Sequence, residues 1–211
     1  MAIEIERRFL LSRMLLDDEF ETYGMYTITQ GYFKRGARIR LCESSIYNDT
    51  GLRNYLHYDE IFTNKYSAFI TFKCDRHQEF EYPIPYQEAL TILNKHCDKS
   101  RLIHKRRYVG KPIPTHSNKY MFEIDEFTEG FNGIVIGEIE IPHKECAIFL
   151  PSFCLNREIT HIANTSNGFM ASLPPTARMW FVEEMNKLLH GQTDFIPTPN
   201  IVGYKRQLFE E

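Results

Sequence analysis

The chain has no long apolar run and no surplus of positive charge, and nothing at its start resembles a signal peptide. None of its hydrophobic stretches approaches the roughly 18 residues that a membrane-spanning helix needs. Acidic residues within the first six positions, with no apolar region behind them, argue against a cleaved leader. The net charge of −3 argues against a general nucleic-acid-binding protein, which normally carries a basic surplus.

Several common site motifs are missing as well. There is no GxxxxGK[ST] loop, no GxGxxG turn and no HExxH helix, so the sites that these motifs build are not expected. The cysteines contain no CxxC pair and leave one over in any disulfide scheme; they are Cys42, Cys74, Cys97, Cys146 and Cys154. A reduced, cytoplasmic protein is the simplest interpretation. The length of 211 residues suits one large domain.

Aromatic residues and alternating patterns favour β structure. The chain holds 16 Phe and 12 Tyr, which suit pleated, half-buried surfaces. Strand-like sequence, in most cases with apolar residues alternating with polar or charged ones, occurs in eight segments, which predicts strands over 2–10, 27–33, 37–42, 69–73, 79–84, 101–110, 119–127 and 134–142. Helices are expected over 87–97 and 176–189, where apolar residues recur at helical spacing. This order of elements predicts an antiparallel α+β domain of about eight strands with helices added outside.

The charged residues of these strands occur at a spacing of two, so they share one face of each strand. The acidic set is Glu4, Glu6, Glu79, Glu81, Glu123, Asp125, Glu138 and Glu140, and the basic set is Arg8, Arg38, Arg40, Lys73, Lys105 and Arg107. One interpretation is an ordinary solvated sheet face with charged cross-strand pairs. For the run 104–107, contact with RNA is a further alternative.

A second interpretation is a sheet that curls shut with its charges inside. The pattern recurs in six or seven strands with little Ser, Thr, Asn or Gln, and basic and acidic strands are segregated. A lumen with about fourteen ionised groups cannot be dry, because their desolvation costs more than their mutual attraction returns. The chemistry matches a polyphosphate with divalent cations, because Arg and Lys bind phosphate oxygens and carboxylates bind Mg²⁺ or Mn²⁺.

An ordered series of short motifs runs through about residues 2–171. It comprises Glu4-Ile5-Glu6-Arg7-Arg8, Gln30-Gly31-Tyr32, Arg38-Ile39-Arg40, Thr71-Phe72-Lys73, Arg76 with Glu79-Phe80-Glu81, Lys105-Arg106-Arg107-Tyr108, Glu123-Ile124-Asp125, Gly137-Glu138-Ile139-Glu140 and Glu158-Ile159-Thr160. The series resembles the CYTH superfamily, which includes inorganic triphosphatases, thiamine triphosphatases and class IV adenylyl cyclases. Each motif alone is weak, and the order is specific.

The resemblance implies an eight-stranded, antiparallel, closed β tunnel over 1–172, with helices outside, and a C-terminal helix and tail over 173–211. It implies metal-dependent hydrolysis of tripolyphosphate or a related triphosphate, with Mg²⁺ or Mn²⁺ as cofactor. Carried over by position, the metal ligands are Glu4, Glu6, Glu123, Asp125, Glu138 and Glu140. The substrate-binding residues are Arg38, Arg40, Lys73, Arg76, Lys105 and Arg107, and the catalytic residues are Arg8, Tyr32 and Glu6.

Two departures from the family pattern bear on activity. Arg8 stands where the family has Lys, and Arg cannot donate a proton at neutral pH. If that position needs a compact ammonium, turnover falls while binding survives. After Thr160, bacterial relatives usually carry an acid and then Arg-Tyr, whereas this chain has Ile162, Asn164 and Thr165. A non-catalytic triphosphate sensor and an adenylyl cyclase therefore stay open as alternatives, as does a homodimer; no membrane or nucleic-acid partner is expected.

Overall fold

The computed structural model describes most of the chain in segments. The described residues are 5–13, 22–33, 37–46, 65–75, 78–110, 113–114, 119–141, 143, 146, 148, 150–155 and 157–197. Glu4, Arg76 and the tail beyond residue 197 lie outside them, and the side chain of Lys73 is not described either.

The centre of the fold is one antiparallel sheet of eight strands in the order β1-β10-β9-β6-β2-β3-β4-β5. The strands are β1 Ile5–Leu11, β2 Thr22–Tyr32, β3 Ala37–Ile46, β4 Tyr66–Asp75, β5 Gln78–Pro83, β6 Ile103–Gly110, β9 Phe122–Phe127 and β10 Val135–Ile141. A separate pair joins β7 Ile113–Pro114 to β8 Lys119–Tyr120. The predicted α+β class with an eight-stranded antiparallel sheet is confirmed.

The start of β2 differs from its expected position. The alternation predicts a strand from residue 27, whereas β2 begins at Thr22. The register on β6 shifts between Thr22 and Gly24, which marks a bulge or irregularity. Such an irregularity breaks the period of two on which the prediction rests, so the pattern missed these residues.

Among the residues that the structure describes, three helices accompany the sheet, and two of them match the expected segments. They are α3 Tyr86–His96, α4 Asn167–Ser172 and α5 Pro175–Leu189, with short 3₁₀ turns η2 Lys99–Arg101 and η3 Ser152–Cys154. α5 starts with a proline, whose fixed φ suits the first helical turn. It ends before Gly191, which has φ +68° and supplies a left-handed stop. Within the described residues, no helix is long and apolar enough to cross a membrane.

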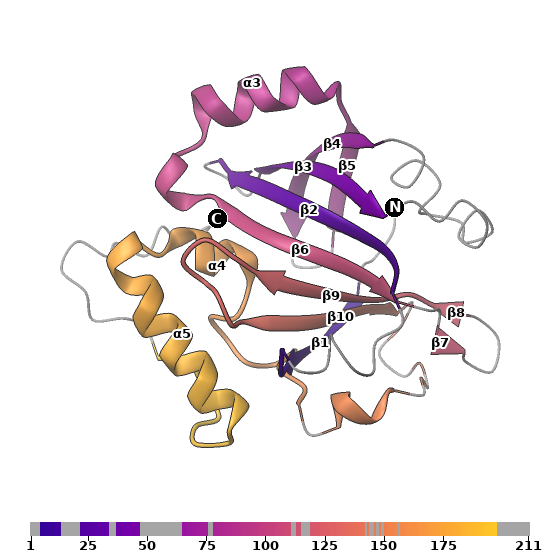
Figure 1. Ribbon diagram of the computed structural model, residues 1–211, viewed down its shortest axis with the longest axis vertical. Helices are drawn as coiled ribbons and strands as arrows, with labels where there is room; N and C mark the ends of the chain where they lie inside the picture. The colour runs from indigo at the N-terminus through magenta and orange to yellow at the C-terminus, as the bar shows by residue number, and fades with distance from the viewer. Residues whose placement is uncertain are drawn as a thin grey trace.

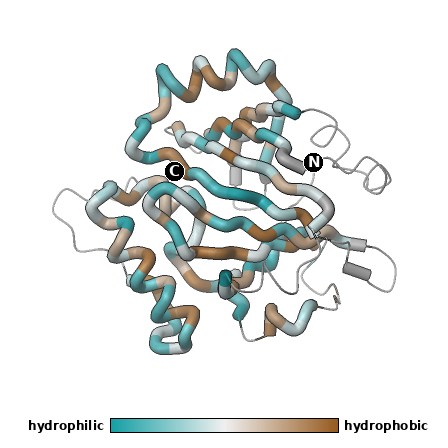
Figure 2. The backbone as a smooth tube through the Cα atoms, viewed as in Figure 1, coloured by the Kyte–Doolittle hydropathy of each residue, from teal (hydrophilic) through white to brown (hydrophobic). Residues whose placement is uncertain are grey.

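The outer face of the sheet is covered by apolar contacts. α3 packs Ala89 and Leu93 against Ile39 and Leu41 of β3. On the other half, the η3 region packs against β1, β9 and β10 through a cluster of Phe9, Leu11, Phe122, Ile124, Val135, Ile139 and Cys154. Hydrophobic and hydrophilic segments alternate along α3 and α5 (Figure 2), as expected for helices that bury one side.

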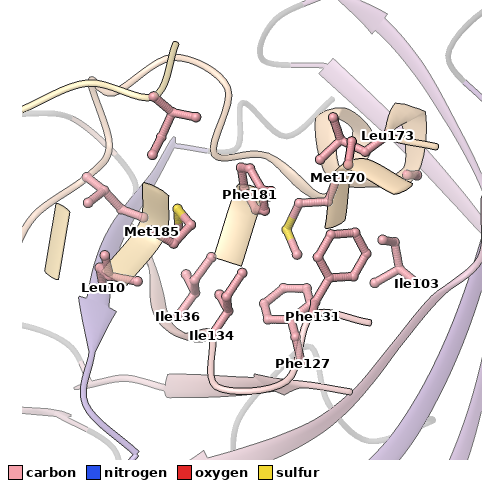
Figure 3. Close-up of a cluster of buried hydrophobic side chains, with 14 residues drawn as sticks. Leu10, Ile103, Phe127, Phe131, Ile134, Ile136, Met170, Leu173, Phe181 and Met185 are labelled. Atoms are coloured by element: carbon pink, nitrogen blue, oxygen red, sulfur yellow. The ribbon is translucent and has the colours of Figure 1, made fainter. Parts of the chain in front are cut away.

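A third apolar cluster lies at one end of the inner face, the face that carries the charged stripes. Leu10, Ile103, Phe127 and Ile136 each stand two positions from a charged residue of the same strand, so they share its face. All four are buried against residues of α4 and α5, among them Phe181. Figure 3 shows these side chains converging with Met170, Leu173 and Met185. The charged face is therefore sealed at this end by apolar packing.

The two ends of the sheet order are β1 and β5, which lie at opposite ends of the curved sheet in Figure 1. The outer edge of β1 pairs with the segment 157–159: Leu10 N donates to Arg157 O at 2.9 Å, and Ile159 N donates to Arg8 O at 2.8 Å. Between the described parts of β1 and β5 there is no strand pairing. The structure thus shows a curved eight-stranded sheet, and the closed tunnel stays an expectation.

Candidate functional site

The strand register brings the predicted charged stripes onto one face. Arg8 lies opposite Glu138, which lies opposite Glu123 on the next strand. Asp125 lies opposite Arg107 of β6. Farther along the sheet, Arg38 lies opposite Thr71, Thr71 lies opposite Glu81, and Lys73 lies opposite Glu79. These residues come from seven strands, and the period-two reasoning located them because each strand keeps its alternation.

An ion network surrounds Asp125, and its central residues are deeply buried. Asp125 is 1% exposed and Lys105 is 2% exposed. Arg107 donates from Nε to Asp125 Oδ1 and from Nη2 to Asp125 Oδ2, both at 2.7 Å. Its Nη2 also reaches Glu138 Oε2 at 2.9 Å, its Nη1 pairs with Glu123, and Lys105 Nζ pairs with Asp125. Two cations and three carboxylates thus form one ion-pair network.

The environment favours the charged form of two carboxylates of this network, Asp125 and Glu138. Burial alone would raise the pKa of Asp125, but the charges and hydrogen bonds of Arg107 and Lys105 outweigh it and lower the pKa. The pKa of Glu138 is also lowered, because Lys105, Arg107 and Arg8 outweigh burial and the nearby Asp125. Burial, followed by the charge of Arg107, lowers the pKa of Lys105. The cations thus hold the carboxylates of Asp125 and Glu138 in their ionised form, whereas the shift of the Lys105 pKa favours the neutral amine.

A second network joins β3, β4 and β5. Arg38 Nη2 reaches Glu79 Oε2 at 3.1 Å, and Arg40 Nη2 reaches Glu81 Oε2 at 3.5 Å. The buried hydroxyl of Thr71 donates to Glu81 Oε2 at 2.7 Å. Burial would raise the pKa of Glu81, but Arg40, Thr71 and Arg38 together lower it. The sequence pattern placed Glu79 and Glu81 in the acidic set but indicated no role for them. In the structure they form ion pairs with Arg38 and Arg40.

Electrostatic interactions connect the two networks. Arg107 of the first network contributes to the lowered pKa of Glu81 in the second. Arg40 in turn interacts with Arg107 and Glu123 across the face. The face therefore carries one continuous field of alternating charges, which suits a ligand with several charges.

Tyr32 lies at the boundary between these charges and the apolar cluster. Its ring packs against that cluster, and its hydroxyl accepts a hydrogen bond of 2.8 Å from Gln30 Nε2. Burial raises the pKa of Tyr32 to about 12, and the charges of Arg38, Arg40, Glu138 and Glu79 also act on it. The phenol is thus neutral, with its own proton available for donation. Sequence reasoning assigned no role to Gln30, because one buried amide leaves no pattern.

Arg8 is buried at the β1 end of the face. Its Nε lies 3.3 Å from Glu138 Oε1 and 3.7 Å from Glu6 Oε1. Its other two nitrogens leave the sheet: Nη1 donates to Thr165 Oγ1 at 3.2 Å and Nη2 to the Thr165 carbonyl at 2.7 Å. The two departures from the family motifs, at Arg8 and at Thr165, are therefore in direct contact.

The donor set suits a hard divalent cation, because carboxylate oxygens are the ligands that Mg²⁺ and Mn²⁺ prefer. Glu6 lies directly opposite Glu140 at the open end of the face, and both are exposed. Deeper in, Glu123, Asp125 and Glu138 are held by Arg107. Among the residues that the structure describes, no three acidic, His or Cys side chains are placed to hold one ion. The carboxylates thus match a divalent cation in their chemistry and in the face on which they lie.

Comparisons with known proteins were made by sequence and by structure. No family model matches the chain. Over 82 residues it is 39% identical to a curated inorganic triphosphatase of Acetivibrio thermocellus; the match covers 39% of this chain and 48% of the relative. The chain thus spans about half the length of that relative. The similarity to triphosphatases inferred from the motifs is confirmed.

Solved structures give weaker similarities. The crystal structure of the inorganic triphosphatase NE1496 is 21% identical, with a TM-score of 0.49, and the match covers 82% of this chain and 98% of that one. The Hippeastrum protein HpAC1, which has a dominant triphosphatase activity, is 14% identical, with a TM-score of 0.40 and coverage of 68% and 81%.

Proposed function

We propose that this CYTH-like chain is a metal-dependent triphosphatase that hydrolyses inorganic tripolyphosphate or a related organic triphosphate. The observation that carries the proposal is the buried network of Lys105, Arg107 and Asp125 with its neighbouring arginines. A buried ion network adds little stability compared with apolar packing, so its extent points to a charged ligand. The curated relative is an inorganic triphosphatase, which supports the same conclusion.

The basic residues are the proposed grip on the phosphates. Arg38 and Arg40 lie on β3, on one side of β2, and Lys105 and Arg107 lie on β6, on its other side. A chain of phosphates that lies over β2 would therefore meet cations on both sides. Guanidinium groups bind phosphate oxygens in pairs. Lys73 and Arg76 are proposed to extend this set.

The acidic residues are the proposed metal ligands. Glu6 and Glu140 would hold Mg²⁺ or Mn²⁺ at the open end, with Glu138, Glu123 and Asp125 deeper inside. Glu4 is proposed as a further ligand. When bound, such an ion neutralises phosphate charge and lowers the pKa of a coordinated water.

Hydrolysis then depends on how the chain's own residues position and neutralise charge, as in other phosphoryl transfers. Arg107 pairs with three carboxylates. It would keep an anionic partner if a phosphate oxygen replaced one of them, so a bound ligand would leave this cation paired. The neutral Tyr32 hydroxyl would donate a hydrogen bond to a phosphate oxygen while its own oxygen accepts one from Gln30. The apolar cluster of α4 and α5 excludes water from the sealed end.

Three further expectations belong to the same proposal. The eight strands of the curved sheet are proposed to enclose the ligand in a closed tunnel. Residues 1–172 form the tunnel domain and 173–211 its appended helix and tail. A cytoplasmic location fits the free thiols of Cys42, Cys97, Cys146 and Cys154, which a reducing compartment preserves.

The test is a hydrolysis assay on purified protein with tripolyphosphate, ATP or thiamine triphosphate and Mg²⁺ or Mn²⁺. We expect phosphate release from at least one of them, abolished in Glu138→Gln and retained in Glu88→Gln, which changes an exposed residue of α3. Release of pyrophosphate with cyclic AMP would establish the cyclase instead. Tight binding without turnover, with activity gained in Arg8→Lys, would establish the sensor.

A further inference from the structure

Arg8 differs from the other cations of the inner face in the direction of its hydrogen bonds. Arg38, Arg40 and Arg107 pair with carboxylates of the sheet. The guanidinium of Arg8 instead spans from Glu138 to Thr165, a residue outside every strand. Three of its nitrogens are thereby used, so the plane of the group is fixed from two sides.

Thr165 is itself held firmly. It is 2% exposed, and its hydroxyl donates to Ile162 O at 2.9 Å. Since that proton is used, the oxygen faces Arg8 as an acceptor. Asn164 adopts φ +67°, a left-handed conformation that Asn tolerates better than most residues, and its amide donates to Ile196 O at 2.9 Å. Ser166 then caps α4. The loop therefore presents two oxygens at a defined place.

These two acceptors match a guanidinium. Arg offers a planar fork of N–H groups, which can bond two oxygens of one residue and a carboxylate at the same time. The backbone of Arg8 is held by the same segment, because its N–H donates to Thr160 Oγ1 at 3.0 Å and its carbonyl accepts from Ile159. Without Thr165, the side chain would be free to settle on Glu6, which already lies 3.7 Å away.

We propose that Thr165 is a positioning residue, whose hydroxyl and carbonyl hold the Arg8 guanidinium beside Glu138 in the orientation that meets a bound triphosphate. This inference rests on the proposed function. It gives the Arg8 guanidinium a fixed place beside Glu138 on the inner face. It also means that the Thr at position 165 and the Arg at position 8 function as a pair.

The experiment is a double-mutant cycle between Thr165→Val and Arg8→Lys. Valine keeps the shape of threonine and removes the hydroxyl, while the backbone carbonyl remains. We measure kcat and KM for tripolyphosphate with Mg²⁺ or Mn²⁺ in the full chain. In the Arg8 background, Thr165→Val should lower kcat roughly tenfold, the loss typical of one hydrogen bond to a charged group, with little change in KM. In the Arg8→Lys background the same change should have roughly no further effect on kcat.

Two controls separate positioning from folding. Thr165→Ser keeps the hydroxyl and should restore kcat. Thr91→Val removes a hydroxyl that donates to Gln87 O on α3, away from the inner face, and should leave kcat unchanged. An equal loss of kcat in both position-8 backgrounds would overturn the inference while leaving the triphosphatase intact. A wild-type chain that turns over no triphosphate would instead contradict the proposed function, and the inference would fall with it.

Discussion

The substitution Asp125→Asn tests whether the central network is held by charge. The asparagine has almost the same shape, so packing is preserved, but Lys105 and Arg107 lose the anion that both contact. Removing one partner of a buried ion pair costs about 3–5 kcal/mol. Glu123 and Glu138 still reach Arg107, so we expect the lower end, about 3 kcal/mol. For a chain of this length, each kcal/mol corresponds to a melting-temperature change of roughly 2–4 °C.

The assay is urea unfolding at several pH values, with Asp98→Asn as the control. Asp98 is 59% exposed and bonds Ser100 in a turn, so its change should cost less than about 0.5 kcal/mol. The pKa of Asp125 is lower in the folded chain than in the unfolded chain. Its stabilising effect is therefore complete above the unfolded value of about 3.9 and is lost as the pH falls toward the folded value. A difference between wild type and Asp125→Asn below about 0.5 kcal/mol at pH 7, or one that grows on acidification, would refute the reasoning.

Three other substitutions test separate parts of the structure. Gln30→Leu removes the donor that holds the hydroxyl of Tyr32 and should lower kcat for tripolyphosphate several-fold; an unchanged kcat would contradict the assigned contact. Phe181→Ala empties a fully buried site between α5 and the sheet and should cost about 3–5 kcal/mol in denaturant unfolding; a loss below about 1 kcal/mol would argue against that packing. Gly137→Ala would place a Cβ 2.5 Å from Phe122 Cζ and should destabilise by about 1–3 kcal/mol, whereas a neutral result would mean that the ring has room to move.

The sequence pattern predicted the sheet and its inner face because both depend on the period of two. Spacing alone grouped Arg107 with Lys105, and Asp125 with Glu123, on one face of each strand; the register then makes Arg107 and Asp125 neighbours. Pairing order could not be derived that way, since contacts such as β2 with β6 join residues far apart in the chain. The irregularity near Gly24 shows the limit of the method, because a shifted register removes the signal.

The sequence pattern also failed to predict the contacts that single polar residues make in the site. Gln30 and Thr165 each make a specific contact in the site, yet neither belongs to a repeating pattern. The sequence pattern did not predict that an apolar cluster packed by α4 and α5 covers one end of the inner face. Leu10 and Phe127 continue the charged stripes by spacing, but only the packing of α5 shows that they close one end. The roles assigned to the charged residues remain predictions that depend on ligand binding.

Calorimetric titration of tripolyphosphate is the most direct measurement of whether the inner face is a polyanion site. Wild type is compared with Arg40→Met and with Lys95→Met, which removes an exposed cation from α3, at one salt concentration with Mg²⁺ present. We expect Kd to rise by roughly tenfold or more in Arg40→Met, since hydrogen bonds between charged groups are worth about 1.5–3 kcal/mol, and to stay unchanged in Lys95→Met. Equal, small changes in both variants would mean that the anion binds elsewhere, and the account would be wrong.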